Sequence, residues 1–144
     1  MTVVDSSILT PEERAVYGPR ANILIPAAEG MPSATEVSVD TVWIDEALAA
    51  RPDLVNAFRE SLATDKAQEA AVAVENLHRD APELFDAFGV LTAGAYLMNP
   101  QVKALIGYPG QEAREIVGDD VPEYVDMLEK VVDRGGVYRP TLHD

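Results

Sequence analysis

The sequence contains no cysteine and only two histidines, and these shortages exclude several kinds of chemistry. Without cysteine the chain has no disulfide, thiol nucleophile, iron–sulfur cluster or cysteine-based zinc site. No apolar run approaches the roughly 20 residues that a membrane-spanning helix needs. Residues 1–10 contain neither a basic residue nor a long apolar stretch, so they do not resemble a secretory or twin-arginine signal. We therefore expect a cytoplasmic protein.

Basic residues are also scarce, at 11 against 25 acidic residues, which gives a formal net charge of −14. An acidic surface repels nucleic acid and anionic membranes, because phosphate binding depends on clustered Lys and Arg. We therefore set nucleic-acid binding aside. The acidic surface is either a solubility device or one half of an interface with a basic partner.

Aromatic residues make up only 6% of the chain, and strand signals are scarce, whereas helix starts and stops recur. Thr10 and Glu13 flank Pro11 in the pattern of a capped helix start. Gly18-Pro19 is expected to break or kink this helix, because proline lacks an N–H donor. By the same reasoning, helices are expected at residues 10–17, 37–51, 52–62, 65–78, 82–98, 100–106 and 120–134, with irregular stretches at 26–35 and 107–119.

These segments predict an all-α fold, with a single domain over residues 1–144 that holds five to seven helices and irregular loops. Residues 1–9 and 137–144 are expected to be extended tails. The segment 82–98 is the most hydrophobic, and its apolar residues recur at three- and four-residue steps, so it is predicted to be the central helix. Its predicted core residues are Leu84, Phe85, Phe88, Leu91, Ala95 and Met98.

Glu75 and His78 place a carboxylate and an imidazole on one face of a predicted helix. Ferritin-like di-iron sites need this Glu-x-x-His motif twice, and the second histidine, His143, has Pro140 where the glutamate would stand. A serine nucleophile elbow and a phosphate loop are also missing. We therefore predict no catalytic, cofactor-binding or metal-binding residue. A helical metalloenzyme that uses Glu75 and His78 is the least favoured alternative.

The stretch 93–110 combines helix endings with an irregular loop. It contains the end of an apolar helix, a restart capped by Asn99 ahead of Pro100, and a stop at Gly107. Pro109 and Gly110 then suit the central positions of a turn. The pattern indicates a rigidly presented protrusion that holds another protein, rather than a catalytic loop.

Several segments, taken in order and spacing, share a pattern with one known family. They are residues 9–13 with 21–27 (Ile25-Pro26-Ala27 at its end), 33–35 with 42–48, the most specific segment 97–100 with 105–110, and the tail segment 134–139. On these segments the chain resembles the gluconate 2-dehydrogenase subunit 3 family.

The resemblance implies a small helical subunit that holds no cofactor and binds a large flavoprotein of the glucose–methanol–choline oxidoreductase type. That large subunit carries FAD and the sugar or alcohol site, and the small one serves its maturation, stability or export. Many members carry a twin-arginine leader, which this sequence lacks at its start, so a cytoplasmic complex and a stabilising role are expected.

Ile106, Tyr108 and Pro109 are expected to contact the large subunit. For Tyr108 the alternative is that its side chain packs beneath the loop as a core residue. A function of another class stays open beside the accessory subunit. It is a free-standing acidic helical module that binds or regulates a basic partner.

Overall fold

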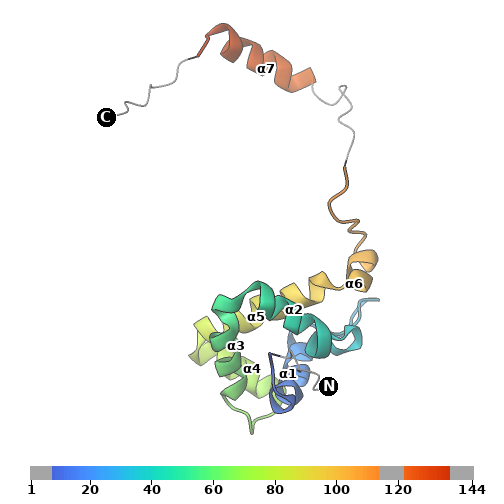
Figure 1. Cartoon of the computed structure of the whole chain (residues 1–144), viewed down its shortest axis with the longest axis vertical. Helices are drawn as coiled ribbons and strands as arrows, with labels where there is room; N and C mark the ends of the chain where they lie inside the picture. The colour runs from blue at the N-terminus through green and yellow to red at the C-terminus, as the bar shows by residue number, and fades with distance from the viewer. Residues whose placement is uncertain (1–7, 114–121, 137–144) are drawn as a thin grey trace, which may run out of the picture. The chain divides into compact units, whose positions relative to one another are not determined.

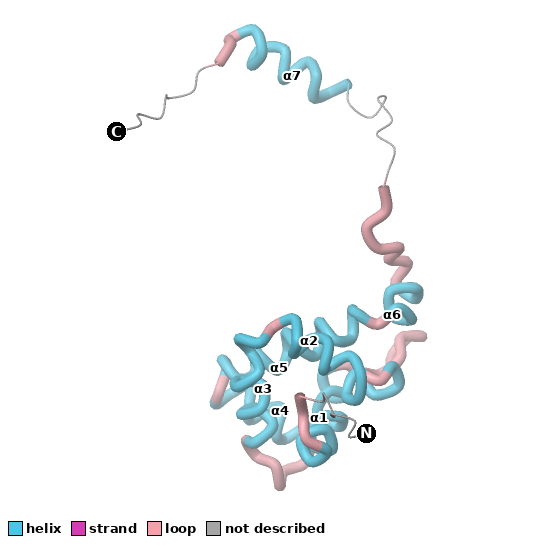
Figure 2. Tube along the Cα trace, viewed as in Figure 1, coloured by secondary structure: helices cyan, strands magenta, loops and turns pink. Residues whose placement is uncertain are grey.

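In the computed structural model, the described residues are 8–113 and 122–136. The described ranges contain seven α-helices and no β-strand (Figure 2). The all-α fold class predicted from the sequence is therefore confirmed.

The chain divides into two compact units, residues 1–110 and 111–144. Helices α1 to α6 belong to the first unit and α7 belongs to the second (Figure 1). The single domain expected over residues 1–144 stays a prediction, and each unit is described by itself.

Helix α1 (Pro11–Leu24) begins where the sequence predicts. The Thr10 hydroxyl accepts a hydrogen bond from the Glu13 N–H at 3.2 Å, and the Glu13 carboxylate accepts one from the Thr10 N–H at 2.9 Å. This reciprocal pair satisfies two donors that every helix start leaves free.

Of the break or kink predicted at Gly18-Pro19, the break is wrong, because α1 continues through Pro19. Tyr17 and Ala21, on either side of the proline, are fully buried in the core. A proline inside a helix removes one hydrogen bond. Packing of the neighbouring side chains offsets that loss, so the tertiary context overrides the local preference.

The helix predicted over 37–51 is also wrong in its first part. The structure has a 3₁₀ helix η1 (Thr35–Val37), then Ser38 with a left-handed φ of 60°, a π-helical turn η2 (Val39–Trp43), and helix α2 (Ile44–Ala50). Val37 and Val39 are both buried. On a regular α-helix two such residues would point to widely different sides, so the irregular turn at Ser38 lets both reach the core.

The start predicted at Pro52 for the next helix is right, and the start predicted at Asp65 for the helix after it is wrong. After a 3₁₀ turn η3 (Pro52–Leu54), helix α3 spans Val55–Ala63, and α4 spans Ala70–Asp80. Asp65 therefore does not cap α4. It lies in the turn between the two helices with a φ of 52°, and its carboxylate accepts a hydrogen bond from Asn76 at 2.9 Å.

Helix α5 (Pro82–Met98) is the central helix of the first unit, as predicted, and it contacts α2, α3, α4 and α6. Three buried aromatic rings meet beside it. The centroid of the Tyr17 ring lies 5.1 Å from that of Phe58 and 5.9 Å from that of Phe88, while the Phe58 and Phe88 rings are 6.0 Å apart. Such pairs add about 0.5–1.5 kcal/mol each beyond the burial of their area.

The core residues predicted on α5 divide into two groups. Phe88, Leu91 and Ala95 are buried, and Leu84, Phe85 and Met98 are partly buried against the same core. Leu9, predicted to end an extended tail, also packs into this core. The rest of the predicted tails, at residues 1–7 and 137–144, lies outside the described residues.

Helix α6 (Pro100–Leu105) begins at the predicted Asn99 cap, whose side-chain oxygen accepts hydrogen bonds from the N–H groups of Gln101 and Val102. The helix ends at Gly107, whose φ is 69°. The Gly107 N–H donates to the Ala104 carbonyl at 3.1 Å, and the Tyr108 N–H donates to the Lys103 carbonyl at 2.8 Å. These two bonds form a Schellman motif, which needs a left-handed residue at the glycine position.

Helix α7 (Pro122–Asp133) is the helix described in the second unit. The predicted cap at Asp120 lies outside the described residues. At the other end, the predicted stop is confirmed, because Gly135 has a φ of 73° and its N–H donates to the Val132 carbonyl at 3.0 Å.

Candidate functional site

One segment of the first unit differs sharply in charge from the rest of the chain. Charged residues make up 25% of the sequence, yet from Ala87 to Gly110 the only charged side chain is Lys103. This segment contains most of α5, all of α6 and the turn that follows. The cores of protein interfaces are likewise depleted in charged residues.

The side of α5 that faces away from the core is apolar and exposed. Val90 is 52% exposed and Leu97 is 51% exposed, and Ala93 between them is exposed as well. A helix that is hydrophobic around its whole circumference is normally buried on all sides. These three residues are named the outer face of α5, and nothing in the described part of the first unit covers it.

The end of α6 presents a second group of apolar side chains. Leu105, Ile106 and Tyr108 are each about half exposed, and Pro109 is exposed too. The predicted contact residues Ile106, Tyr108 and Pro109 therefore lie on the surface, as a contact role requires. The alternative that Tyr108 packs in the core is wrong, because the Schellman motif carries the chain outward at Gly107. Leu105 to Pro109 are named the α6 terminus.

A hollow of about 540 Å³ lies next to the α6 terminus. One wall is formed by the loop at residues 27–32, and the other includes Gln101 and Leu105 of α6. Glu29 and Glu36 supply the charged groups among its lining residues. The surface beside the α6 terminus is therefore concave, partly apolar and acidic at its edge.

Side chains of α1, α5 and the α6 cap fix the loop beside this hollow and the η1 turn that follows it. The Asn22 side chain of α1 donates to the Thr35 hydroxyl at 2.8 Å and accepts from the Thr35 N–H at 3.0 Å. The Tyr96 hydroxyl of α5 donates to the Pro32 carbonyl at 2.7 Å. The buried Asn99 side chain donates to the Val37 carbonyl at 2.8 Å. The loop is thus anchored at several points.

The Glu36 side chain forms hydrogen bonds with Ser33 in the loop. Its carboxylate accepts hydrogen bonds from both the N–H and the hydroxyl of Ser33, each at 2.7 Å. These two bonds hold the pKa of Glu36 below its ordinary value, and the bond from the Ser33 N–H makes the larger contribution. Burial, with a smaller contribution from the nearby Glu36 charge, raises the pKa of the Tyr96 hydroxyl, which therefore stays protonated as a donor.

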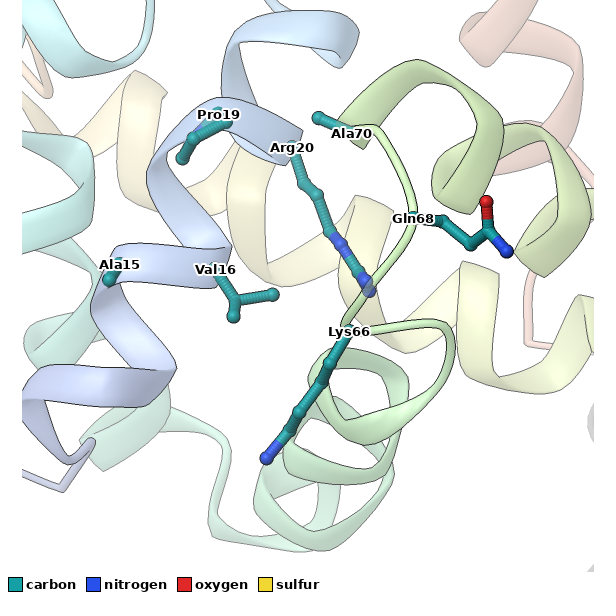
Figure 3. Close-up of a pocket in the computed structure, with 7 residues that line it drawn as sticks. All are labelled: Ala15, Val16, Pro19, Arg20, Lys66, Gln68 and Ala70. Carbon is teal, nitrogen blue, oxygen red and sulfur yellow. The ribbon is translucent and has the colours of Figure 1, made fainter.

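A second hollow, of about 190 Å³, lies between α1 and the start of α4 (Figure 3). Arg20 reaches from α1 and donates to the carbonyls of Ser61, Thr64 and Asp65 at 2.8–3.0 Å. Lys66 and Gln68 point away from the Arg20 guanidinium (Figure 3). The polar groups do not converge on one point, so we assign Arg20 a structural role. Its guanidinium binds carbonyl groups at the end of α3.

Glu75 and His78 do not form the start of a metal site in the described residues. Both side chains are exposed, and the His78 ring packs edge-on against Phe85 with their centroids 4.7 Å apart. No group of three or more His, Asp or Glu residues that could hold a metal ion is found in residues 8–113 and 122–136. His143 lies outside these ranges.

None of the described helices combines the length and the apolar character needed to cross a lipid bilayer.

The sequence predicts the contact residues of the α6 terminus but not those of the outer face of α5. Val90 and Leu97 belong to a helix that was predicted to be central, so their exposure was not expected. The signal that reveals them is the run without charge around them, since an exposed helix face in a chain of net charge −14 would ordinarily carry acidic residues.

In comparisons with known proteins, no family model matches the chain, and neither a curated protein nor a solved structure matches it.

Proposed function

We propose that this chain is a non-catalytic small subunit that binds and stabilises a large FAD-dependent sugar or alcohol oxidoreductase. The large subunit supplies FAD and the reaction site, the small chain holds no cofactor, and the complex is cytoplasmic. The resemblance of residues 97–110 to the gluconate 2-dehydrogenase subunit 3 family supports the choice of partner. The observation that carries the binding role is the exposed, uncharged outer face of α5.

Exposure of the outer face is costly unless a partner covers it. Each square ångström of apolar surface that a partner removes from water contributes about 25 cal/mol. Interface cores resemble this face, since they are apolar and depleted in charge, whereas acidic side chains suit the solvated rim. Val90 and Leu97, both half-exposed, are therefore assigned to the centre of the contact.

The α6 terminus is suited to recognition because it is presented rigidly. Its start is fixed by the Asn99 cap, and its end is fixed by the two hydrogen bonds of the Schellman motif. The neighbouring loop is tied down by Asn22, Tyr96 and Asn99. A preordered surface loses little conformational entropy on binding, so more of its contact energy appears as affinity.

Co-expression tests this proposal. The flavoprotein encoded by the neighbouring reading frame is produced with and without this chain, and the FAD content per polypeptide of the soluble flavoprotein is measured by absorbance. We expect both the soluble yield and the FAD content to fall without the chain. Equal recovery of soluble, FAD-loaded flavoprotein in both cases, or a neighbouring frame that encodes no flavoprotein, would contradict the proposal.

The net charge of −14 favours one other function, a free-standing acidic module that binds a basic partner. The two functions differ in their response to salt. Exposed charges are screened beyond about 10 Å at 0.1 M salt, so a complex held by surface charge weakens steeply as salt rises. A complex centred on the outer face of α5 keeps most of its affinity, because apolar burial does not depend on screening.

A further inference from the structure

Helix α7 carries an apolar face that its own unit leaves uncovered. Leu128 and Val131 are each about half exposed, and Val132 is 73% exposed. They fall at helical spacing, so they share one side of the helix. The described residues of the second unit contain no other helix that covers this side.

A helix of this size gains little stability from its own backbone. The helix spans 12 residues, and isolated helices shorter than about 12–15 residues are marginal in water. Most helical stability in proteins comes from packing of an apolar face. Packing of another surface against the face formed by Leu128, Val131 and Val132 would therefore stabilise α7.

The charges of the molecule indicate which kind of surface this is. Glu129 and Asp133 lie four residues apart on the flank of α7 next to Val132. A second copy of the chain has a net charge of −14 and would repel an acidic helix. A partner with Lys and Arg at the edge of an apolar groove is complementary to it.

We propose that α7 is a docking helix, which inserts Leu128, Val131 and Val132 into an apolar groove with a basic rim on the partner flavoprotein. The inference rests on the proposed function, because the flavoprotein is the partner in question. It adds a second attachment point to the one formed by the outer face of α5 and the α6 terminus. Helix-in-groove binding of this kind uses apolar anchors at three- and four-residue spacing.

Two attachment points on one chain strengthen each other. Once the first is bound, the second binds at an effective concentration set by the connecting segment, so the complex is tighter than either contact alone. Loss of α7 docking therefore weakens the complex without abolishing it.

The test measures the affinity of full-length variants for the purified flavoprotein subunit by titration calorimetry. The double variant Leu128→Asp/Val131→Asp is expected to weaken binding about tenfold or more, because it places charge in an apolar groove. The matched control Glu129→Gln/Asp133→Asn changes the acidic flank of α7 and leaves Leu128, Val131 and Val132 in place. It is expected to change the affinity by less than about threefold and to reduce its dependence on salt.

An unchanged affinity in the Leu128→Asp/Val131→Asp variant overturns the docking helix. The variant Leu97→Asp in the outer face of α5 separates this failure from failure of the proposed function. If Leu97→Asp abolishes binding while the α7 variant binds like the wild type, the subunit assignment stands and only the docking helix is wrong. If the wild-type chain does not bind the flavoprotein, both proposals fail.

Amide hydrogen exchange of residues 128–132 distinguishes the possible occupants of the apolar face. We expect weak protection in the free chain at any concentration and strong protection in the complex. Protection that appears in the free chain only at high concentration would identify a second copy as the occupant. Protection in the dilute free chain would mean that the same chain covers α7, and either result overturns the proposal.

Discussion

The two sides of helix α5 are nearly equal in apolar character and opposite in exposure. On the inner side, Phe88, Leu91 and Ala95 are buried against α2, α3 and α4. On the outer side, Val90 and Leu97 keep about half of their surface exposed. The difference shows that apolar content alone does not tell a fold-stabilising face from a binding face. What distinguishes them is whether another element of the chain covers them.

The first prediction compares the two sides by substitution, and it has the largest expected effect. Phe88→Ala removes a ring from the buried aromatic group and is expected to lower the free energy of unfolding by about 3–5 kcal/mol. Leu97→Ala on the outer side is expected to change it by less than about 0.5 kcal/mol. Urea denaturation measures both values. Similar losses for the two variants would mean that the outer face also stabilises the fold.

The second prediction concerns Asn99, which joins the end of α5 to the start of α6. Asn99→Ala removes the cap of α6 and leaves the buried Val37 carbonyl without its donor, at a cost of about 2 kcal/mol. Asn99→Ser keeps a cap oxygen but not the donor to Val37, so it should recover part of that loss. Denaturation of the three proteins measures the two contributions, and equal stability of wild type and Asn99→Ala would contradict the assignment.

The third prediction tests a buried polar contact on the inner side of α5. The Tyr17 hydroxyl donates to Thr92 at 3.1 Å, and both residues are fully buried. Tyr17→Phe keeps the ring packing and removes this hydrogen bond, so the free energy of unfolding should fall by about 1 kcal/mol. A loss as large as that of Phe88→Ala would show that the ring group itself had rearranged, which a crystal structure of the variant would reveal.

The smallest expected effect depends on pH and concerns the loop held by Tyr96 of α5. Because two hydrogen bonds from Ser33 lower the pKa of Glu36 in the folded state, its stabilising contribution is present above the ordinary pKa of 4.5. That contribution is lost as the pH falls through the lower folded value. Glu36→Gln should therefore lose less stability than the wild type between about pH 6 and about pH 3. Identical pH profiles would contradict this role.

Local signals in the sequence predicted the helix ends that depend on neighbouring residues. The capping pair of Thr10 and Glu13, the Asn99 cap and the Gly107 stop are all confirmed. Each depends on hydrogen bonds within one or two turns of chain, and that range is what a short residue pattern encodes.

Predictions failed where distant contacts decide the local structure. Burial of Tyr17 and Ala21 carries α1 through Pro19, and burial of Val37 and Val39 imposes the irregular turn at Ser38. These contacts join residues far apart in the sequence, so no local pattern contains them. For the candidate site, the exposed α6 terminus followed from its stop signals. The outer face of α5 did not, because the sequence does not show which side of an apolar helix lacks a neighbour.

The measurement that bears most directly on the outer face of α5 is the affinity of the Leu97→Asp variant for the flavoprotein subunit. Its matched control is Val72→Asp on α4, which also places a carboxylate at an exposed apolar position. If the outer face is the centre of the contact, Leu97→Asp unfolds with nearly the wild-type free energy yet loses binding, whereas Val72→Asp binds normally. Wild-type affinity in a folded Leu97→Asp variant would contradict the account.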